Sequence, residues 1–174
     1  MEIFHGTRQL FSNFDTSYKG TGESGDIDAC WFADNFEGAR HHALYKNRND
    51  GAPLVYRCEL SSDVVLANHR KPLSEQTRVR DSLLKVLPVS LSTTMNSGRE
   101  WFAMAKPHYI KSKGKLLHLG SDFLTDEVLI KYYKLSGIHG VYDWEGMFTD
   151  GYIRGTTIIM FDFSCLTIKE IIEV

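Results

Sequence analysis

A strand that runs directly into a helix, at residues 29–46, sets the strongest limit on the fold. Its first part reads Ala-Cys-Trp-Phe-Ala, a short apolar and aromatic run that is typical of a strand. Asp34 or Asn35 then offers a side chain that can cap a helix over residues 36–46, with Glu37 in the first turn. This unit predicts a mixed α/β fold, in which the strand places the helix beside a sheet.

The rest of the first half predicts further short strands. Residues 2–5 form a strand that ends in His5-Gly6-Thr7, and residues 16–28 form a glycine-rich loop. Residues 53–60 are rich in β-formers, and residues 64–66 extend the sheet after a turn. We therefore expect at least three strands before the middle of the chain.

The middle is more helical. Apolar residues recur at near-helical spacing over residues 74–87, which Pro88 closes, and a second helix is predicted at 97–105. A lysine-rich segment, 106–115, breaks the pattern and is expected to be a solvated loop. Thr125 can then cap a helix that runs to Leu135.

The last part returns to strands. Gly137 follows the helix, as a C-terminal glycine often does, and residues 140–142 come next. Residues 157–162 are apolar almost throughout, which favours a central strand. Residues 166–174 are compatible with a final strand or a short helix.

Composition limits the class of protein. A chain of 174 residues with a net charge of -2 predicts one domain, residues 1–174, without a global basic field for nucleic acid or membrane. The three cysteines are widely spaced and form no metal-ligand pattern, so we expect reduced thiols and no metal. His41 and His42 point in different directions on a helix and do not predict a metal pair. With no signal peptide and no apolar span in the sequence, we expect a cytoplasmic protein that does not enter a membrane.

Two motifs together carry a family resemblance. His5-Gly6-Thr7 closes the first strand, and the run from Trp31 to His42 places a second ring eleven residues after the first. This pair resembles the NAD-binding signature of ADP-ribosyltransferases related to diphtheria toxin and the poly(ADP-ribose) polymerases. Residues 124–172 resemble the C-terminal part of many phage and bacterial domains of this type.

The resemblance implies a fold and a domain layout. The expected fold is α+β, a split β-sandwich of two mostly antiparallel sheets packed face to face, with the NAD cleft between them and helices at the sides. The likeness covers residues 1–60 and 124–172. Residues 61–123 match no known pattern and are taken as a family-variable insert.

The same resemblance implies roles for the motif residues. NAD is the substrate: His5 bonds a ribose hydroxyl, and the backbone of Gly6 pairs with the nicotinamide carboxamide. Trp31 and His42 sandwich the nicotinamide, with Tyr45 as a fallback ring. The remaining cofactor-binding residues are those that complete the motifs: Thr7, Phe32 and Ala39. Ala39 stands where the family often has a serine, so one carboxamide bond is absent.

The family's acidic residue is replaced here. Thr157 occupies the position of a glutamate that bonds the ribose and assists the acceptor. Two acids in the preceding loop, Asp150 and Glu145, are the expected substitutes, with Asp150 favoured because Asp150-Gly151 is a flexible point. The resemblance also implies that an uncharged residue at this position goes with transfer of a single ADP-ribose unit.

The function expected from these motifs is mono-ADP-ribosyl transfer from NAD to a macromolecule. We expect a protein of the host as acceptor, with nucleic acid as the alternative, and a phage- or toxin-type effector as the context. Two other classes stay open. One is an NAD glycohydrolase, or a module that binds NAD or ADP-ribose without transfer, which suits Thr157. The other is an interaction protein that blocks a partner through residues 61–123 and the lysine-rich segment.

Overall fold

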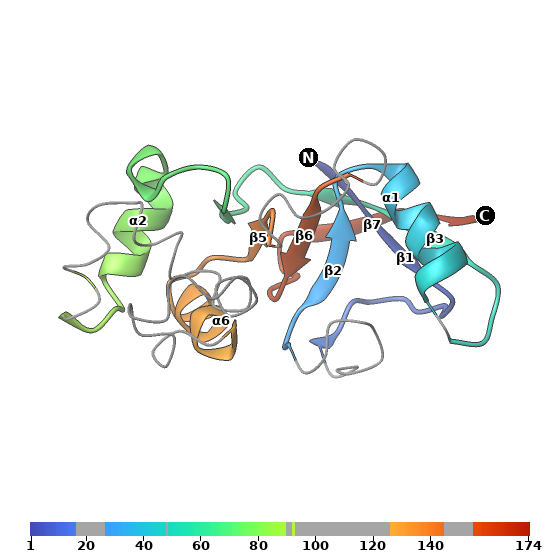
Figure 1. Ribbon diagram of the computed structural model, residues 1–174, viewed down its shortest axis with the longest axis horizontal. Helices are drawn as coiled ribbons and strands as arrows, with labels where there is room; N and C mark the ends of the chain where they lie inside the picture. The colour runs from blue at the N-terminus through green and yellow to red at the C-terminus, as the bar shows by residue number, and fades with distance from the viewer. Residues whose placement is uncertain (17–26, 48, 90–91, 93–125, 145–154) are drawn as a thin grey trace, which may run out of the picture.

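The computed structural model describes residues 1–16, 27–47, 49–89, 92, 126–144 and 155–174. In these residues the protein is mixed α+β, with one seven-stranded sheet and few helices (Figure 1). The strands are β1 (Glu2–Thr7), β2 (Cys30–Ala33), β3 (Leu54–Leu60), β4 (Leu66–Asn68), β5 (Gly140–Tyr142), β6 (Thr157–Met160) and β7 (Leu166–Glu173). The helical segments are α1 (Phe36–His41), the π-helical η2 (His42–Lys46), the 3₁₀ turn η3 (Leu73–Glu75), α2 (Thr77–Leu84) and α6 (Asp126–Leu135).

The sheet has two halves that meet at a narrow junction. Its strand order is β4-β5-β6-β2-β1-β3-β7, and all neighbours are antiparallel except β4 and β5. β1 pairs with β3 along its whole length, but with β2 only where Phe4 faces Ala33. We call β4, β5, β6 and β2 the β2 half, and β1, β3 and β7 the β1 half.

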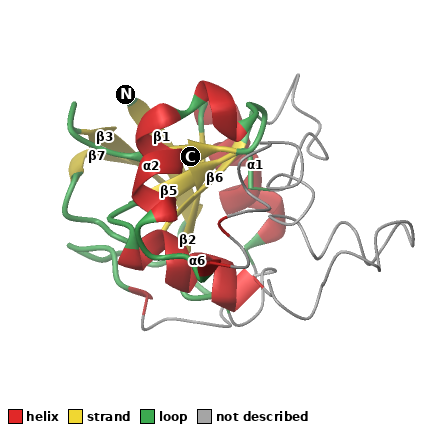
Figure 2. Cartoon of the chain, turned by 90° about the vertical axis from the view of Figure 1, so that its left-hand side faces the viewer, coloured by secondary structure: helices red, strands yellow, loops and turns green. Residues whose placement is uncertain are grey.

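Two clusters of buried side chains lie against this sheet. The first is built around α2, α6 and the β2 half, and it includes Leu83, Leu129, Tyr133, Val141 and Ile159. Figure 2 views the molecule from the end at which α2 and α6 lie. The second cluster takes strand residues from both halves: Ile3, Phe32, Tyr56, Cys58, Leu60, Ile158 and Met160. No described helix contributes a buried residue to it, so the two halves share this core directly.

The sequence led us to expect two separate sheets, whereas the structure has a single hydrogen-bonded sheet. Within the described ranges, the halves are joined edge to edge by the one pair between Phe4 and Ala33. They nevertheless share the second core, as the halves of a folded sheet do. The α+β class and the mostly antiparallel pairing agree with the prediction.

Most predicted elements are confirmed, with small shifts at their ends. The strands at 2–5, 29–33 and 53–60 are present, and residues 140–142, to which the sequence assigned no element, form β5. The strand at 157–162 is interior, between β5 and β2, and the segment 166–174 is a strand rather than a helix.

Three boundaries differ from the prediction. β4 begins at Leu66, not at residue 64. The helix expected over residues 74–87 is split, because Gln76 has φ -120° and ψ 58°, which is not helical, and it separates η3 from α2. The helix over residues 36–46 continues as a π-helix after His41.

Local signals at the helix ends settle two predictions. Asn35, not Asp34, caps α1: its Oδ1 accepts a hydrogen bond from the backbone N–H of Gly38 at 2.7 Å. Gly137 follows α6 with φ 70°, in the left-handed region that favours glycine. The predicted helix at 97–105 and the lysine-rich segment at 106–115 lie outside the described residues, as does most of the loop 16–28.

Candidate active site

His5 lies at the junction between the two halves of the sheet. Its Nδ1 is 2.6 Å from the carbonyl oxygen of Trp31 on the neighbouring strand. A carbonyl oxygen only accepts, so Nδ1 carries the hydrogen and donates it, and Nε2 keeps its lone pair. The ring is thereby held in one tautomer, with one nitrogen left to accept a hydrogen bond.

The surroundings of His5 keep it neutral. Its ring centroid lies 5.3 to 6.3 Å from those of four aromatic residues: Phe11, Phe14, Phe32 and Tyr56. Burial lowers the pKa of His5 to about 4; the bond to the Trp31 carbonyl opposes this, and the charge of His42 adds to it. At pH 7 the imidazole is uncharged, so Nε2 is able to accept a hydrogen bond.

Gly6 is a glycine because helix α1 packs directly on it. A Cβ at Gly6 would lie 1.9 Å from the carbonyl oxygen of Ala39 and 2.9 Å from the backbone nitrogen of Ala43. Both alanines are buried, and α1 lies beside β1 in Figure 1. The sequence interpretation assigned the small residue to a close approach of nicotinamide, whereas the structure gives the close approach of a helix as its cause.

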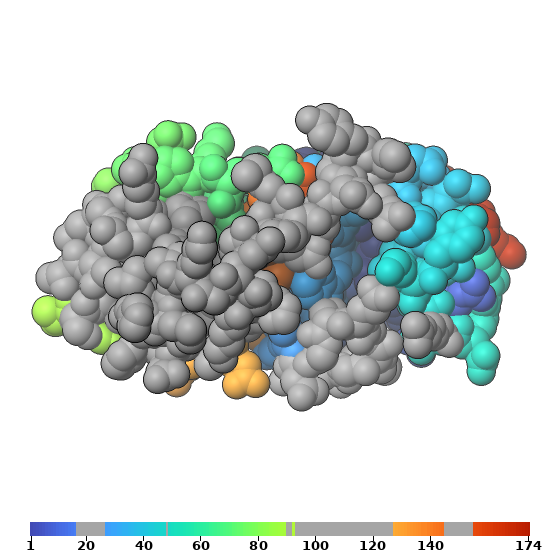
Figure 3. Space-filling model, in the orientation of Figure 1, coloured from blue at the N-terminus to red at the C-terminus, as the bar shows by residue number. Residues whose placement is uncertain are grey.

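His42 reaches the same glycine from the end of α1. Its Nδ1 donates to the carbonyl oxygen of Gly6 at 2.9 Å. The predicted second ring is therefore held at the carbonyl that the resemblance assigns to the carboxamide. Tyr45, the fallback ring, is 72% exposed, and its ring lies 5.0 Å from that of His41 at an angle of 44°. The cyan segment that includes η2 forms part of the surface in Figure 3.

The two aromatic residues of the second motif face opposite sides of β2. Trp31 faces Ile159 of β6, and its partly buried ring packs against the first core cluster. Phe32 is 4% exposed and belongs to the second cluster. Thr7 is also buried, and its Oγ1 accepts from the backbone N–H of Gln9 at 3.2 Å. Phe32 and Thr7 thus support the junction, whereas the ring of Trp31 is partly exposed.

Thr157, which the resemblance aligns with a glutamate, begins β6 directly opposite Ala33. It is partly buried, and its carbonyl oxygen accepts from the backbone N–H groups of Asp143 at 2.8 Å and Trp144 at 3.3 Å. The two acids expected to replace the glutamate, Asp150 and Glu145, lie outside the described residues.

A polar network that the sequence interpretation missed surrounds the start of β6. Asp34 accepts from the backbone N–H of Thr156 at 2.7 Å and from the hydroxyl of Tyr142 at 2.8 Å. Arg70 donates from Nη2 to Thr156 Oγ1 at 2.8 Å and from Nε to Asp143 Oδ2 at 3.2 Å. We call Asp34, Arg70, Tyr142, Asp143 and Thr156 the Arg70 network.

The strand directions bring this network together. β2 and β5 both run antiparallel to β6, and β4 is parallel to β5, so β2, β4 and β5 end where β6 begins. The polar residues directly after β2 and β5, together with Arg70 just beyond β4, therefore meet at one edge of the sheet. The sequence contains this signal as polar residues after apolar strands, but only the strand order reveals it.

Close packing and ring contacts complete the network. Gly155 has φ 75°, and a Cβ there would lie 2.5 Å from Asp34 Oδ1. The guanidinium carbon of Arg70 lies 5.6 Å from the centroid of the Tyr142 ring. Burial raises the pKa of Tyr142, so its hydroxyl keeps its proton at pH 7.

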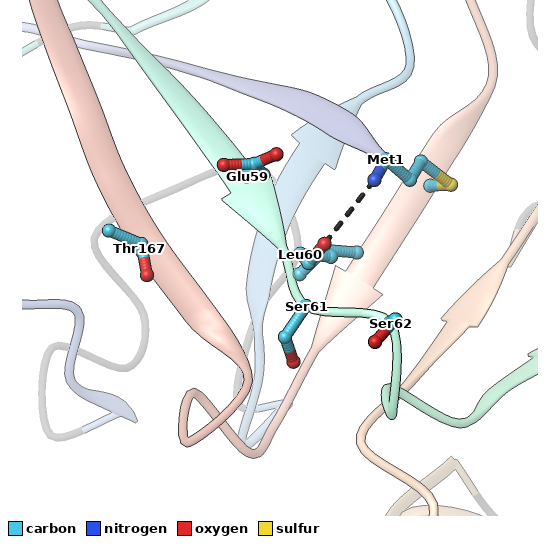
Figure 4. Close-up of a pocket in the computed structure, with 6 residues that line it drawn as sticks. All are labelled: Met1, Glu59, Leu60, Ser61, Ser62 and Thr167. Atoms are coloured by element: carbon cyan, nitrogen blue, oxygen red, sulfur yellow. Dashed lines mark hydrogen bonds between the residues drawn. The ribbon is translucent and has the colours of Figure 1, made fainter.

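A pocket of about 390 Å³ lies away from these residues (Figure 4). It is lined by Met1, Glu59, Leu60, Ser61, Ser62 and Thr167. The terminal amino group of Met1 donates to the Leu60 carbonyl at 3.3 Å across it. None of the predicted site residues lines this pocket, so we do not assign the candidate site to it.

The described residues contain no group of three His, Cys, Asp or Glu side chains that could hold a metal ion. They also contain no helix long and apolar enough to cross a bilayer. Searches against models of protein families, curated proteins and solved structures find no match to this chain.

Proposed function

We propose that the protein is a mono-ADP-ribosyltransferase that moves ADP-ribose from NAD to a macromolecular acceptor, with a host protein as the favoured class. The observation that carries the proposal is the convergence of the two motifs. His5 bonds the carbonyl of Trp31, and Gly6 contacts Ala39 and accepts from His42. Residues up to 37 positions apart in the chain thus meet at one junction, as an NAD-binding signature requires.

The proposed chemistry breaks the bond between the ribose C1′ and the nicotinamide nitrogen. The nitrogen keeps the electron pair and leaves as neutral nicotinamide, so no acid has to protonate it. The sugar passes through an oxocarbenium-like state, as in glycoside hydrolysis. The acceptor forms the new bond to C1′ and loses its proton to a base.

Each motif residue has a task in this scheme. The neutral His5 accepts a hydrogen bond from a ribose hydroxyl through Nε2, since Nδ1 is already used. Trp31 packs on the nicotinamide, and an aromatic face suits its delocalised cation. The Gly6 carbonyl has a second lone pair for the carboxamide besides the one that His42 uses.

The decisive experiment is incubation of the purified chain with labelled NAD and host lysate. A labelled macromolecule supports transfer, and mass spectrometry identifies the modified group. Free ADP-ribose alone supports the second candidate, an NAD glycohydrolase, which Thr157 at the glutamate position favours. If neither a labelled macromolecule nor free ADP-ribose forms, the enzyme proposal is contradicted and binding remains as the function.

His5→Asn is the sharpest variant for this assay. The asparagine amide can still donate to the Trp31 carbonyl, but it lacks an acceptor at the position of Nε2. We expect turnover to fall by about 100-fold, as for other single hydrogen bonds to a transition state. For His42→Ala, His41→Ala is the matched control, because His41 contacts Tyr45 rather than Gly6.

Binding is tested separately from turnover. NAD at about 100 times its dissociation constant should stabilise the fold by about 2.7 kcal/mol. A thermal shift absent at millimolar NAD counts against the proposal. The carboxylate prediction from the sequence is tested with Asp150→Ala and Glu145→Ala, of which the first should cost at least about 100-fold in single-turnover rate.

A further inference from the structure

We propose that Arg70 and Asp143 are positioning residues, which hold the start of β6 in register for ADP-ribosyl transfer. This inference rests on the proposed function and assigns a role to a network outside the two motifs. Arg70 acts through Thr156, which directly precedes Thr157, the residue at the position of the family's glutamate.

The bonds converge on Thr156. Its backbone N–H donates to Asp34 Oδ1 at 2.7 Å, and its carbonyl accepts from the backbone N–H of Asp34 at 3.1 Å. Its hydroxyl oxygen accepts from Arg70 Nη2 at 2.8 Å and lies 3.3 Å from the hydroxyl of Tyr142. Backbone and side chain of this one residue are therefore fixed from β2, β5 and the segment after β4.

Arg70 is itself held in place before it reaches Thr156. Its backbone N–H donates to the side chain of Asn68 at 2.8 Å, and its Nε pairs with Asp143 at 3.2 Å. The side chain of Asp143 is 0% exposed, whereas that of Arg70 is 38% exposed. Because its Nε and Nη2 each have a partner, the guanidinium holds Thr156 at a defined place relative to Asp143. Its planar geometry means that little side-chain entropy is lost for each hydrogen bond.

A contribution to folding stability does not by itself explain the presence of the ion pair between Arg70 and Asp143. Desolvation of a buried charge offsets most of the attraction, so apolar replacements of buried pairs are often neutral or stabilising. The chain also accepts unusual backbone at this place: Asp143 has φ 59°, and Gly155 has φ 75°. Glycine adopts this backbone without strain, whereas non-glycine residues in the left-handed region, such as Asp143, cluster at functional sites.

The network also links the start of β6 to the end of β5. The backbone N–H groups of Asp143 and Trp144 donate to the Thr157 carbonyl, so the exit of β5 and the entry of β6 move together. Thr157 pairs with Ala33, two residues along β2 from Trp31. Loss of the Arg70 contacts should therefore displace the strand start relative to the ring that packs on the nicotinamide.

The test compares Arg70→Met with Arg57→Met. Arg70 makes one ion pair and one side-chain hydrogen bond to Thr156. Arg57 makes two ion pairs, with Glu2 at 2.9 Å and Glu170 at 3.2 Å, but it lies on β3 in the other half of the sheet. We expect Arg70→Met to lower kcat by about 100-fold, the cost of a small misplacement of reacting groups. NAD affinity should stay within about threefold, and Arg57→Met should keep kcat within about twofold.

A double variant separates positioning from folding. Arg70→Met alone removes the guanidinium that pairs with the buried charge of Asp143 and is expected to lower stability. Arg70→Met/Asp143→Asn removes that charge, and asparagine tolerates the left-handed backbone. We expect the double variant to regain thermal stability while kcat remains low. Arg70→Lys keeps the charge but lacks the separate nitrogens from which Arg70 makes its two contacts, so it should show an intermediate kcat.

Three outcomes overturn the inference. If the double variant regains kcat together with stability, the network is structural only. If Arg70→Met keeps the wild-type kcat, Arg70 does not position the site. If the wild-type chain neither transfers nor hydrolyses ADP-ribose from NAD, the proposed function fails and the inference with it. Only this last result concerns the wild type, so the two failures are distinguishable.

Discussion

The junction at β1 and the Arg70 network differ in how they are built. At the junction, His5 and His42 bond backbone carbonyls, and helix α1 packs on a glycine. In the Arg70 network, side chains bond one another and include two carboxylates and a guanidinium. The first region is organised by close packing and by hydrogen bonds to backbone carbonyls, and the second by charge.

This difference has a physical consequence for variants. Close packing fails when an atom is added, because backbone atoms cannot move aside. A charged network fails when a partner is removed, because the remaining polar group is buried without compensation. Four predictions test this contrast, from the largest expected effect to the smallest.

Gly6→Ala should have the largest effect on folding. The new Cβ would meet the Ala39 carbonyl at 1.9 Å, so α1 has to move away from β1. We expect a loss of at least about 3 kcal/mol in the free energy of unfolding, measured with urea. Gly137→Ala is the control, because its φ is 70° but nothing lies within 4 Å of its Cβ. It should cost about 1 kcal/mol, and equal losses would contradict the packing argument.

His5 should make folding stability depend on pH. Its pKa is about 4 in the folded protein, against an ordinary 6.5, so the unfolded chain binds the proton first as pH falls. This contribution is complete above pH 6.5 and is lost as pH falls from 6.5 to 4. The maximum loss is about 3 kcal/mol.

His5→Asn isolates that contribution because asparagine does not titrate in this range. The difference in unfolding free energy between wild type and variant should change steadily between pH 6.5 and 4. A difference that stays constant over this range shows that His5 is not held neutral.

Asp34→Asn should remove one of two accepted hydrogen bonds in the Arg70 network. An amide nitrogen cannot accept, so either the Thr156 N–H or the Tyr142 hydroxyl loses its partner. We expect a loss of about 2 kcal/mol in chemical denaturation. The control is Asp28→Asn, whose side chain is 39% exposed and whose pair with Lys134 should contribute at most about 1 kcal/mol. A larger effect in the control would remove the distinction between the two environments.

Asn35→Ala should have the smallest effect of the four. It removes the N-terminal cap of α1, whose Oδ1 accepts from Gly38 at 2.7 Å. A cap of this type contributes about 1 kcal/mol, measurable as a shift of the urea midpoint at constant slope. A loss as large as that of Gly6→Ala would mean that the cap, rather than the glycine contact, holds α1 on the sheet.

Sequence reasoning was reliable where the signal is local. The apolar run before Asp34 predicts β2, and the residues after it predict α1, because strand and cap preferences act within a few positions. It could not choose between Asp34 and Asn35 as the cap. That choice depends on Thr156 and Tyr142, more than 100 positions away, which bind Asp34 instead.

The sequence by itself determined a mixed fold of helices and strands and most element positions in the described residues. It also predicted that the strands of His5 and Trp31 lie together, and His5 bonds the Trp31 carbonyl. Tertiary structure alone decided that the two halves form one sheet joined at Phe4 and Ala33. It also decided that Arg70 meets Asp143 and Thr156. The physical reason is that strand order and buried ion pairs depend on contacts between segments far apart in the chain, and no local preference encodes them.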